Sequence, residues 1–488
     1  MGGDRRDQPS PSADRSTLMR GASQAARTSQ PHAPAPALDR RLGPFDAAAI
    51  VISNVIGSGI FFVPVVVAQL VPHPAAIIGV WLAGGALAFA GAMAYAELAA
   101  LKPHAGGEYV YLREAFGPQV AFLSGWTSFI AGFSGAIAAG SVALADYIGR
   151  FIPAAADTTP LVGISGLSIS PRSLVALTPI AVLTIIHVRG LGPGRILQNV
   201  LAGLKVSAIV VFVAIGFAIG HGNMSHLAAN ASAAPVSMLL ALVPVMFSYS
   251  GWNAAAYVAE EVRNPARNVP LALALGTATV VVLYIALNAL YLFAMPVADI
   301  AALPGGRLID TVAERLFGFV AADLLAIFTI VSIAASVSAM VLAGPRVYYA
   351  MARDGLFVQM AERVHPRFHT PAAAIIAQGI WSGVLVLSGT LSQLVSYTGF
   401  AVVLFAGVAV LALFVLRRRD RRARPFVAFG YPWAPGIFVV ASVAMVVNEL
   451  FRNAATTLTG LAIIAAGIPA YYAMRRAPTV SATPAARR

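Results

Sequence analysis

The sequence predicts an all-α membrane protein with twelve transmembrane helices. Three observations support this: 58% of the 488 residues are hydrophobic, 11% are charged, and the apolar residues gather in long uninterrupted runs. Soluble proteins have about 25% charged residues, so the composition excludes a soluble globular domain. The runs have the length that a helix needs to cross a bilayer, and they lie at 45–69, 75–100, 119–148, 173–188, 194–220, 234–259, 270–295, 318–345, 372–389, 393–416, 432–451 and 456–474.

The runs divide the chain into blocks. Residues 1–44 are rich in Ala, Ser, Pro and Arg and have no apolar core of a signal peptide, so we expect a disordered tail. A first block of five spans covers 45–220 and a second covers 234–416, followed by a final pair at 432–474 and a short tail at 475–488.

The distribution of positive charge predicts the topology. Of the 33 Lys and Arg residues, 27 fall on the side of the two termini and five on the opposite side, while Lys205 lies inside a span. Positive residues concentrate in cytoplasmic loops, so we expect both termini in the cytoplasm. The net charge of +13 is therefore explained by topology and by contact with anionic membrane lipids, and a nucleic-acid partner is not expected.

Two of the spans contain helix-breaking residues. Span one reads VISNVIGSGIFFVP (51–64), and span six reads LVPVMFSYSGWNAAAYVAEE (242–261). Each opens a block of five spans, and interruptions at matching positions of two halves are the best sequence indication of a transporter binding site. An uncoiled segment exposes N–H groups that suit a carboxylate and carbonyls that suit an ammonium. The alternative is a simple kink or close helix packing, because small residues are common at helix contacts in membranes.

Five segments resemble a known family. IGSGIF (56–61), YAELAALKPHAGGEYVYLREAFGP (95–118), FSYSGWN (247–253), EEVRNPARNVP (260–270) and RVYYAMARDG (346–355) are similar to the signature segments of the amino acid–polyamine–organocation (APC) transporters. The likeness is strongest to the L-type amino acid exchangers and their bacterial relatives. It implies a LeuT-type fold, in which the two five-span blocks are inverted repeats with discontinuous helices 1 and 6. It also implies alternating access in a bacterial inner membrane.

The resemblance also implies the residues of the substrate site. The N–H groups of Gly57–Gly59 would hold the carboxylate of an amino acid, and carbonyls from both breaks would hold its ammonium. The aromatic ring of Phe247 would cover the substrate as a thin gate. The complete set is Val55, Ile56, Gly57, Ser58, Gly59 and Ile60 from span one, and Phe247, Ser248, Tyr249, Ser250 and Gly251 from span six.

Lys205 is the one Lys or Arg well inside a span. A charge at this depth costs about 3 kcal/mol and is by default a functional residue, although a side chain that reaches the headgroups is the alternative. In the family, a lysine here replaces a bound cation and joins spans one and eight. The resemblance implies that Lys205 contacts the region of Gly57, with Ser336 and Ser338 as partners on span eight and Tyr284 in the same network. It would either bind and release a proton or remain a fixed strut.

The predicted function is exchange of small or medium neutral L-amino acids. The alternatives are proton-coupled symport, antiport of cationic amino acids or polyamines, and a channel or amino acid sensor. The spans contain almost no Asp, Glu or His, which argues against an enzyme. His187 and the other histidines are assigned to loops, and no metal or cofactor is expected. The chain has no cysteine, which excludes the disulfide to a heavy subunit that metazoan L-type exchangers form.

Overall fold

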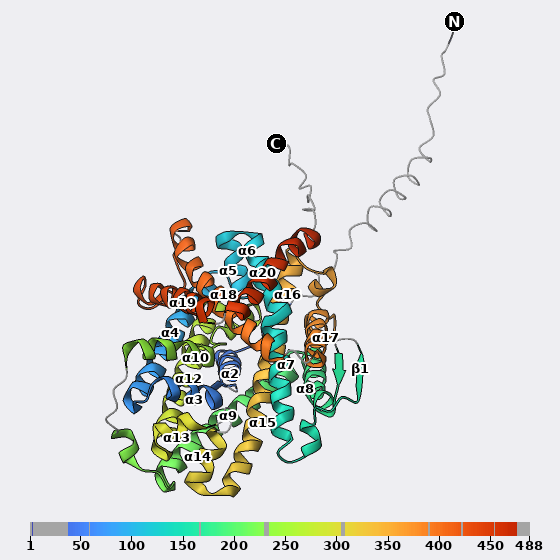
Figure 1. Ribbon diagram of the computed structural model, residues 1–488. Helices are drawn as coiled ribbons and strands as arrows, with labels where there is room; N and C mark the ends of the chain where they lie inside the picture. Colours follow the sequence, from blue (N-terminus) through green and yellow to red (C-terminus); the bar gives the residue numbers. More distant parts are fainter. Residues whose placement is uncertain are drawn as a thin grey trace. The chain divides into compact units, whose positions relative to one another are not determined.

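The computed structural model describes Gly2 and residues 38–475, with gaps at 58, 165–166, 229–233, 304–307, 389–390, 421–422 and 453. The chain divides into two units at Ala37/Leu38. The second unit contains the helices that are labelled in Figure 1.

Nine helical segments of the described residues are long and apolar enough to cross a membrane. A tenth is the bent pair α2 (Pro44–Val55) and α3 (Gly59–Leu70). The nine are α4 (Pro74–Leu101), α6 (Pro118–Thr127) continuing through η1 (Ser128–Gly132) into α7 (Phe133–Ile148), α8 (Pro171–Val188), α9 (Leu191–Ile219), α12 (Pro265–Ala294), α15 (Phe319–Ala343) with α16 (Pro345–Arg353), α18 (Leu391–Arg419), α19 (Trp433–Arg452) and α20 (Ala454–Met474).

Two further apolar helices are shorter, α10 (Pro235–Ser248) and α17 (Ala372–Leu387). They occupy the predicted sixth and ninth spans, so each of the twelve predicted runs contains helix among the residues that the structure describes. The prediction of a helical membrane fold is confirmed. The count of twelve crossings is not established by length, because α10 ends at the interruption of its span. The division into two inverted repeats stays a prediction.

The breaks in spans one and six have local causes. Span one changes direction by 48° between α2 and α3, at the glycine-rich segment that cannot sustain a helix. In span six, α10 gives way to turns around Gly251, whose φ is +99°. Only glycine adopts this region without strain. Short helical pieces follow, α11 (Ala254–Tyr257) and η4 (Ala259–Glu261).

The broken helices lie among long unbroken ones. In Figure 1, α2 lies close to α9, α12 and α15, and the three helices pack against it. In span six, α10 packs against α3 and α4, and α12 runs along α4. The short helix α11, which follows the break in span six, packs against α12 and α15, so both breaks lie beside the same unbroken helices.

Several connecting elements were not predicted. An antiparallel hairpin of β1 (Val162–Ile164) and β2 (Leu167–Ile169) lies beside α8 and α17 in Figure 1. The other helices are α5 (Glu108–Phe116), α13 (Val297–Ala302), α14 (Leu308–Phe317), η2 (Pro153–Ala156), η3 (Met224–Ala228) and η5 (Gln359–Glu362).

Candidate functional site

The two breaks touch each other at two glycines. A Cβ on Gly59 would lie 2.9 Å from Ser248 Oγ and 3.1 Å from Ser248 Cα. A Cβ on Gly251 would lie 2.7 Å from Asn54 Nδ2, and this amide donates a 3.4 Å hydrogen bond to the Gly251 carbonyl. A Cβ at Gly59 would crowd the Ser248 side chain and backbone, and one at Gly251 would displace the Asn54 amide and require a φ of +99°. The close crossing therefore explains why both breaks contain glycine.

Tyr284 joins the two breaks. Its hydroxyl lies 2.9 Å from the Val55 carbonyl of span one and 3.1 Å from the Ser248 carbonyl of span six. The single hydroxyl proton can be donated to one carbonyl at a time. The ring is fixed by Trp81, at 5.5 Å between centroids, and by Tyr249, at 5.0 Å. Tyr284, predicted to belong to the Lys205 network, therefore contacts the breaks themselves.

Lys205 lies on α9 with its side chain completely buried. Its ammonium donates to the Ser53 carbonyl at 3.1 Å and to the Ile56 carbonyl, and it lies 3.3 Å from Ser336 Oγ. Ser336 Oγ lies 2.6 Å from the Ser53 carbonyl and 2.9 Å from the Ile56 carbonyl. The last carbonyls of a helix have no partner within it, so Lys205 and Ser336 together cap the C-terminal end of α2.

The side chain of Lys205 can form hydrogen bonds in this geometry both as an ammonium and as a neutral amine. The protonated ammonium has three donors, which match two carbonyls and the Ser336 hydroxyl oxygen. A neutral amine would donate to the two carbonyls and accept the hydroxyl proton of Ser336. The arrangement is therefore compatible with a fixed strut and with a proton carrier.

Ser338 lies elsewhere. Two residues along a helix differ in direction by about 200°, and Ser338 faces α8, where its hydroxyl lies 3.0 Å from His187 Nε2. The assignment of His187 to a loop is wrong, because α8 extends to Val188 and the side chain is buried. Within the described residues, no group of three or more His, Asp or Glu side chains could hold a metal ion.

The carbonyls expected to bind an ammonium already accept hydrogen bonds. Val55 O accepts from the Gly57 N–H at 2.8 Å in addition to Tyr284, and Phe247 O accepts from the Ser250 N–H at 3.0 Å. A carbonyl has two lone pairs, so a ligand would share or displace these donors.

The remaining site residues differ in exposure. Ile60 and Tyr249 are fully buried, while Phe247 is 39% exposed and its ring lies next to Gly399 of α18. The predicted Ser58 lies outside the described residues.

Ser248 Oγ is buried and has no hydrogen-bond partner within the part of the chain that the structure describes. This hydroxyl faces Gly59 at the crossing.

Ion pairs and backbone hydrogen bonds join α16, the end of span six and the stretch before α2. Arg346 of α16 donates to both carboxylate oxygens of Glu261, at 2.6 and 2.9 Å, and both side chains are buried. The segment before α2 is held to the same place, because the Leu42 N–H donates to the Glu261 carbonyl and the Arg263 N–H donates to the Leu42 carbonyl. Further pairs are Arg353–Glu260, Arg113–Asp354 and Lys102–Glu114.

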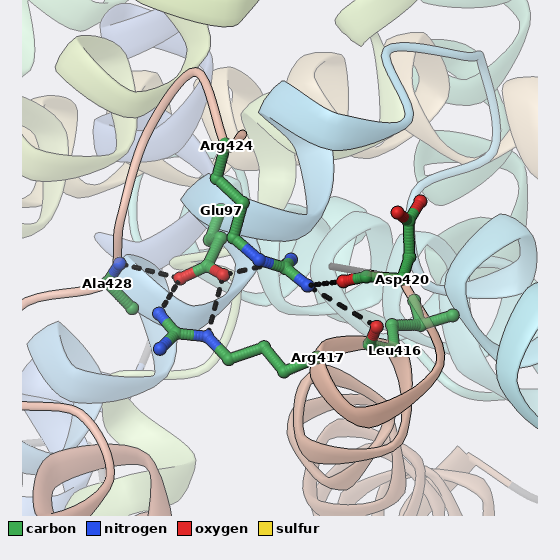
Figure 2. A network of polar contacts seen from close by, with 6 residues as sticks. All are labelled: Glu97, Leu416, Arg417, Asp420, Arg424 and Ala428. Atoms are coloured by element: carbon green, nitrogen blue, oxygen red, sulfur yellow. Dashed lines mark hydrogen bonds and ion pairs between the residues drawn. The ribbon is translucent and has the colours of Figure 1, made fainter. Parts of the chain in front are cut away.

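Glu97, near the end of the predicted span 75–100, belongs to a further charged network. It lies inside α4 and is buried. Figure 2 shows its carboxylate between the guanidinium groups of Arg417 and Arg424, with the Ala428 N–H as a further donor at 2.7 Å. Arg417 binds it through two nitrogens and Arg424 lies 3.1 Å away. The network therefore ties α4 to the end of α18.

Glu108 is the first residue of α5, in the segment that follows span two. It accepts hydrogen bonds from Tyr95 and Ser124, each at 2.9 Å. Burial raises the pKa of the Glu108 carboxyl, and the hydrogen bonds from Ser124 and Tyr95 lower it by less. Asn54 is a residue of the crossing that sequence reasoning missed. The signal for it was a polar residue within the apolar run of span one, three residues before Gly57.

Two interrupted helices that meet inside a helical membrane domain are the arrangement that forms binding sites in many secondary transporters. The family model described as amino acid permease matches residues 42–473. The chain therefore belongs to the amino acid permease family, and its relatives are transporters rather than enzymes.

Three similar proteins illustrate the range of the family. The serine/threonine exchanger SteT of Bacillus subtilis (strain 168) is 28% identical over 90% of this chain and 98% of its own length. The b(0,+)-type amino acid transporter 1 of Oryctolagus cuniculus is 30% identical over 80% of this chain and 78% of its own. The cystine/glutamate transporter of Homo sapiens is 30% identical over 89% and 85%. This chain has no cysteine, so no disulfide can link it to a partner subunit.

Proposed function

We propose that this permease exchanges small neutral L-amino acids across a bacterial plasma membrane, with both termini in the cytoplasm. The observation that supports this most is the crossing of the two breaks at Gly59–Ser248 and Asn54–Gly251. The half-helix that starts at Gly59 presents its positive end there, and the carbonyls beside Tyr284 supply acceptors. A zwitterion has the complementary pair of charges.

The side chains at the crossing support a small neutral substrate. Ser248 contributes a buried hydroxyl, and Asn54 contributes an amide. Neither is charged, so a cationic side chain on the substrate would have no counter-charge there. A relative is described as a serine/threonine exchanger, and a free hydroxyl at this point suits an amino acid that itself has one. Serine and threonine are therefore the first substrates to test.

Capping of α2 by Lys205 supports exchange between two conformations. In alternating access, a half of the protein moves around a fixed site. The cap holds the end of α2 against α9 and α15. Movement of α2 toward an inward-facing state would disrupt these hydrogen bonds. A bound substrate that orders the interrupted segment of span one would then determine the height of the free-energy barrier to this movement. The interlocked ion pairs of Arg346 and Glu261 would open in the same step.

Counterflow in proteoliposomes tests this function. Purified protein is reconstituted with unlabelled serine inside, and uptake of labelled serine is measured against a panel of neutral, acidic and basic amino acids. We expect labelled serine to accumulate only when the proteoliposomes contain internal substrate, and we expect neutral amino acids to inhibit this uptake. The Gly59→Ala variant should lose counterflow, because its Cβ would meet Ser248. Gly203→Ala is the matched control, since a Cβ there meets nothing within 4 Å. Uptake independent of internal substrate would contradict exchange.

A further inference from the structure

A cavity of about 120 Å³ lies at the surface on the side of the chain termini, away from the crossing of the broken helices. Three segments distant in sequence form it: the strand-like stretch before α2, the turn between α8 and α9, and the loop after η5. Six residues give it its character, namely Asp39, Arg41, Arg189, Gly192, Arg367 and His369. A single water needs roughly 10–15 Å³ measured in this way, so the cavity has room for a small multi-atom ion.

The charges in this cavity favour an anion. Arg41 pairs with Asp39 at 2.7 Å, and His369 Nδ1 lies 3.6 Å from the same carboxylate. Among the described residues, no carboxylate pairs with Arg189 or Arg367, although Arg367 also lies 5.6 Å above the Phe368 ring. One acidic side chain thus faces three guanidinium groups, which leaves an excess of positive charge inside a concave surface.

The backbone adds to this charge. The 29-residue helix α9 begins at Leu191 beside the cavity, and its first N–H groups have no acceptor within the helix. The positive end of the helix dipole points to the same place. Guanidinium groups bind phosphate with two parallel hydrogen bonds. A tetrahedral oxyanion matches both the donors and the size of the cavity.

We propose that this cavity binds a phosphate group, which is either the headgroup of an anionic phospholipid or a free phosphate. The turn at Arg189 joins the ends of two membrane helices, α8 and α9, so the cavity lies at the depth of lipid headgroups. A bound phosphate would connect the stretch before α2 to the turn and to the loop after η5. Because Leu42 is also paired with Glu261 and Arg263, this ligand would hold the entry to α2 in place.

One substitution removes the site without harming the fold. A Cβ on Gly192 meets nothing within 4 Å, and an acidic residue in the first turn of a helix is favourable. Gly192→Asp therefore places a negative charge in the cavity at no steric cost. Arg189→Gln and Arg367→Gln remove the donors one at a time. Arg363→Gln and Arg40→Gln are matched controls, because each removes the same charge from a neighbouring exposed position outside the cavity.

The experiment measures binding rather than transport, so it does not depend on the proposed substrate. Full-length protein is reconstituted in phosphatidylcholine with and without phosphatidylglycerol, and retained lipid is counted by native mass spectrometry together with the unfolding temperature. A second arm titrates inorganic phosphate onto protein in detergent. We expect wild-type protein to retain phosphatidylglycerol, or to be stabilised by phosphate, and the Gly192→Asp variant to do neither. Each glutamine variant should bind about fivefold more weakly.

The two arms identify the source of the phosphate. Binding in lipid alone indicates a headgroup, and saturation by inorganic phosphate indicates a soluble ion; both results support the site. Equal losses in the Arg363→Gln and Arg40→Gln controls would show general attraction to an anionic surface and would overturn the proposal. Wild-type binding by a stably folded Gly192→Asp variant would overturn it too.

Discussion

Replacing Lys205 by methionine is the most direct test of the cap on α2. The substitution keeps the length of the side chain and removes its charge and donors. In the wild type, Lys205 donates hydrogen bonds to the carbonyls of Ser53 and Ile56. Ser336 can donate its one hydroxyl proton to only one of these carbonyls at a time. One buried carbonyl is then left without a donor, which costs about 1–3 kcal/mol.

This cost falls on the end of α2 rather than on the whole fold. The methionine variant no longer has to bury a cation, which offsets part of the loss in global stability. We therefore expect an unfolding temperature close to that of the wild type. A loss of 1–3 kcal/mol in the capped conformation corresponds to roughly a 5- to 150-fold change in its population, so counterflow should fall by at least about fivefold.

The assay pairs serine counterflow in proteoliposomes with thermal unfolding in detergent. Ser336→Ala, which leaves the lysine in place, should show a smaller loss. Lys102→Met is the matched control, because this lysine is one-third exposed and pairs with Glu114 outside the spans. Wild-type counterflow in a folded Lys205→Met protein would refute the cap as part of transport. A protein that unfolds would instead assign Lys205 a purely structural role.

Three further predictions follow from single contacts. Tyr284→Phe removes the hydroxyl shared by the Val55 and Ser248 carbonyls, so we expect about 1 kcal/mol less stability and slower counterflow, whereas unchanged counterflow would remove this bridge from the site. Arg346→Met should lower the free energy of unfolding by about 3–5 kcal/mol, since it leaves Glu261 buried and unpaired; a double variant that also changes Glu261 to Leu should regain most of it in a denaturation experiment. Glu108 has a raised pKa in the folded protein, so its stabilising contribution is complete below its unfolded value of 4.5 and is lost as the pH rises through the folded pKa. Glu108→Gln should remove this fall in unfolding temperature above pH 4.5, and identical pH profiles would contradict the assignment.

Much of the site was predictable because its signals are local. The interruptions at 56–59 and 247–251 are rich in glycine and serine, and Lys205 is a charged residue within an apolar run. These features depend on residues next to one another along the chain. The resemblance to a family then predicted their joint role.

The partners were harder to predict, because they depend on the rotation of one helix against another. Ser336 and Ser338 are two residues apart, and nothing in the sequence distinguishes their roles, yet one contacts Lys205 and the other His187. The partners of Glu97 could not be predicted for the same kind of reason. Its partner Arg417 lies 320 residues away, and the carboxylate is buried only because α18 ends beside α4.

The sequence by itself determined that this chain crosses a membrane many times, that spans one and six are interrupted, and that a lysine is buried beside them. These properties follow from hydropathy and helix propensity, which act over one or two turns. The tertiary structure alone decided that Gly59 meets Ser248, that Tyr284 reaches both breaks, and that three arginines surround one cavity. Such contacts join segments distant along the chain, and they exist only when the helices have packed at a fixed angle and register.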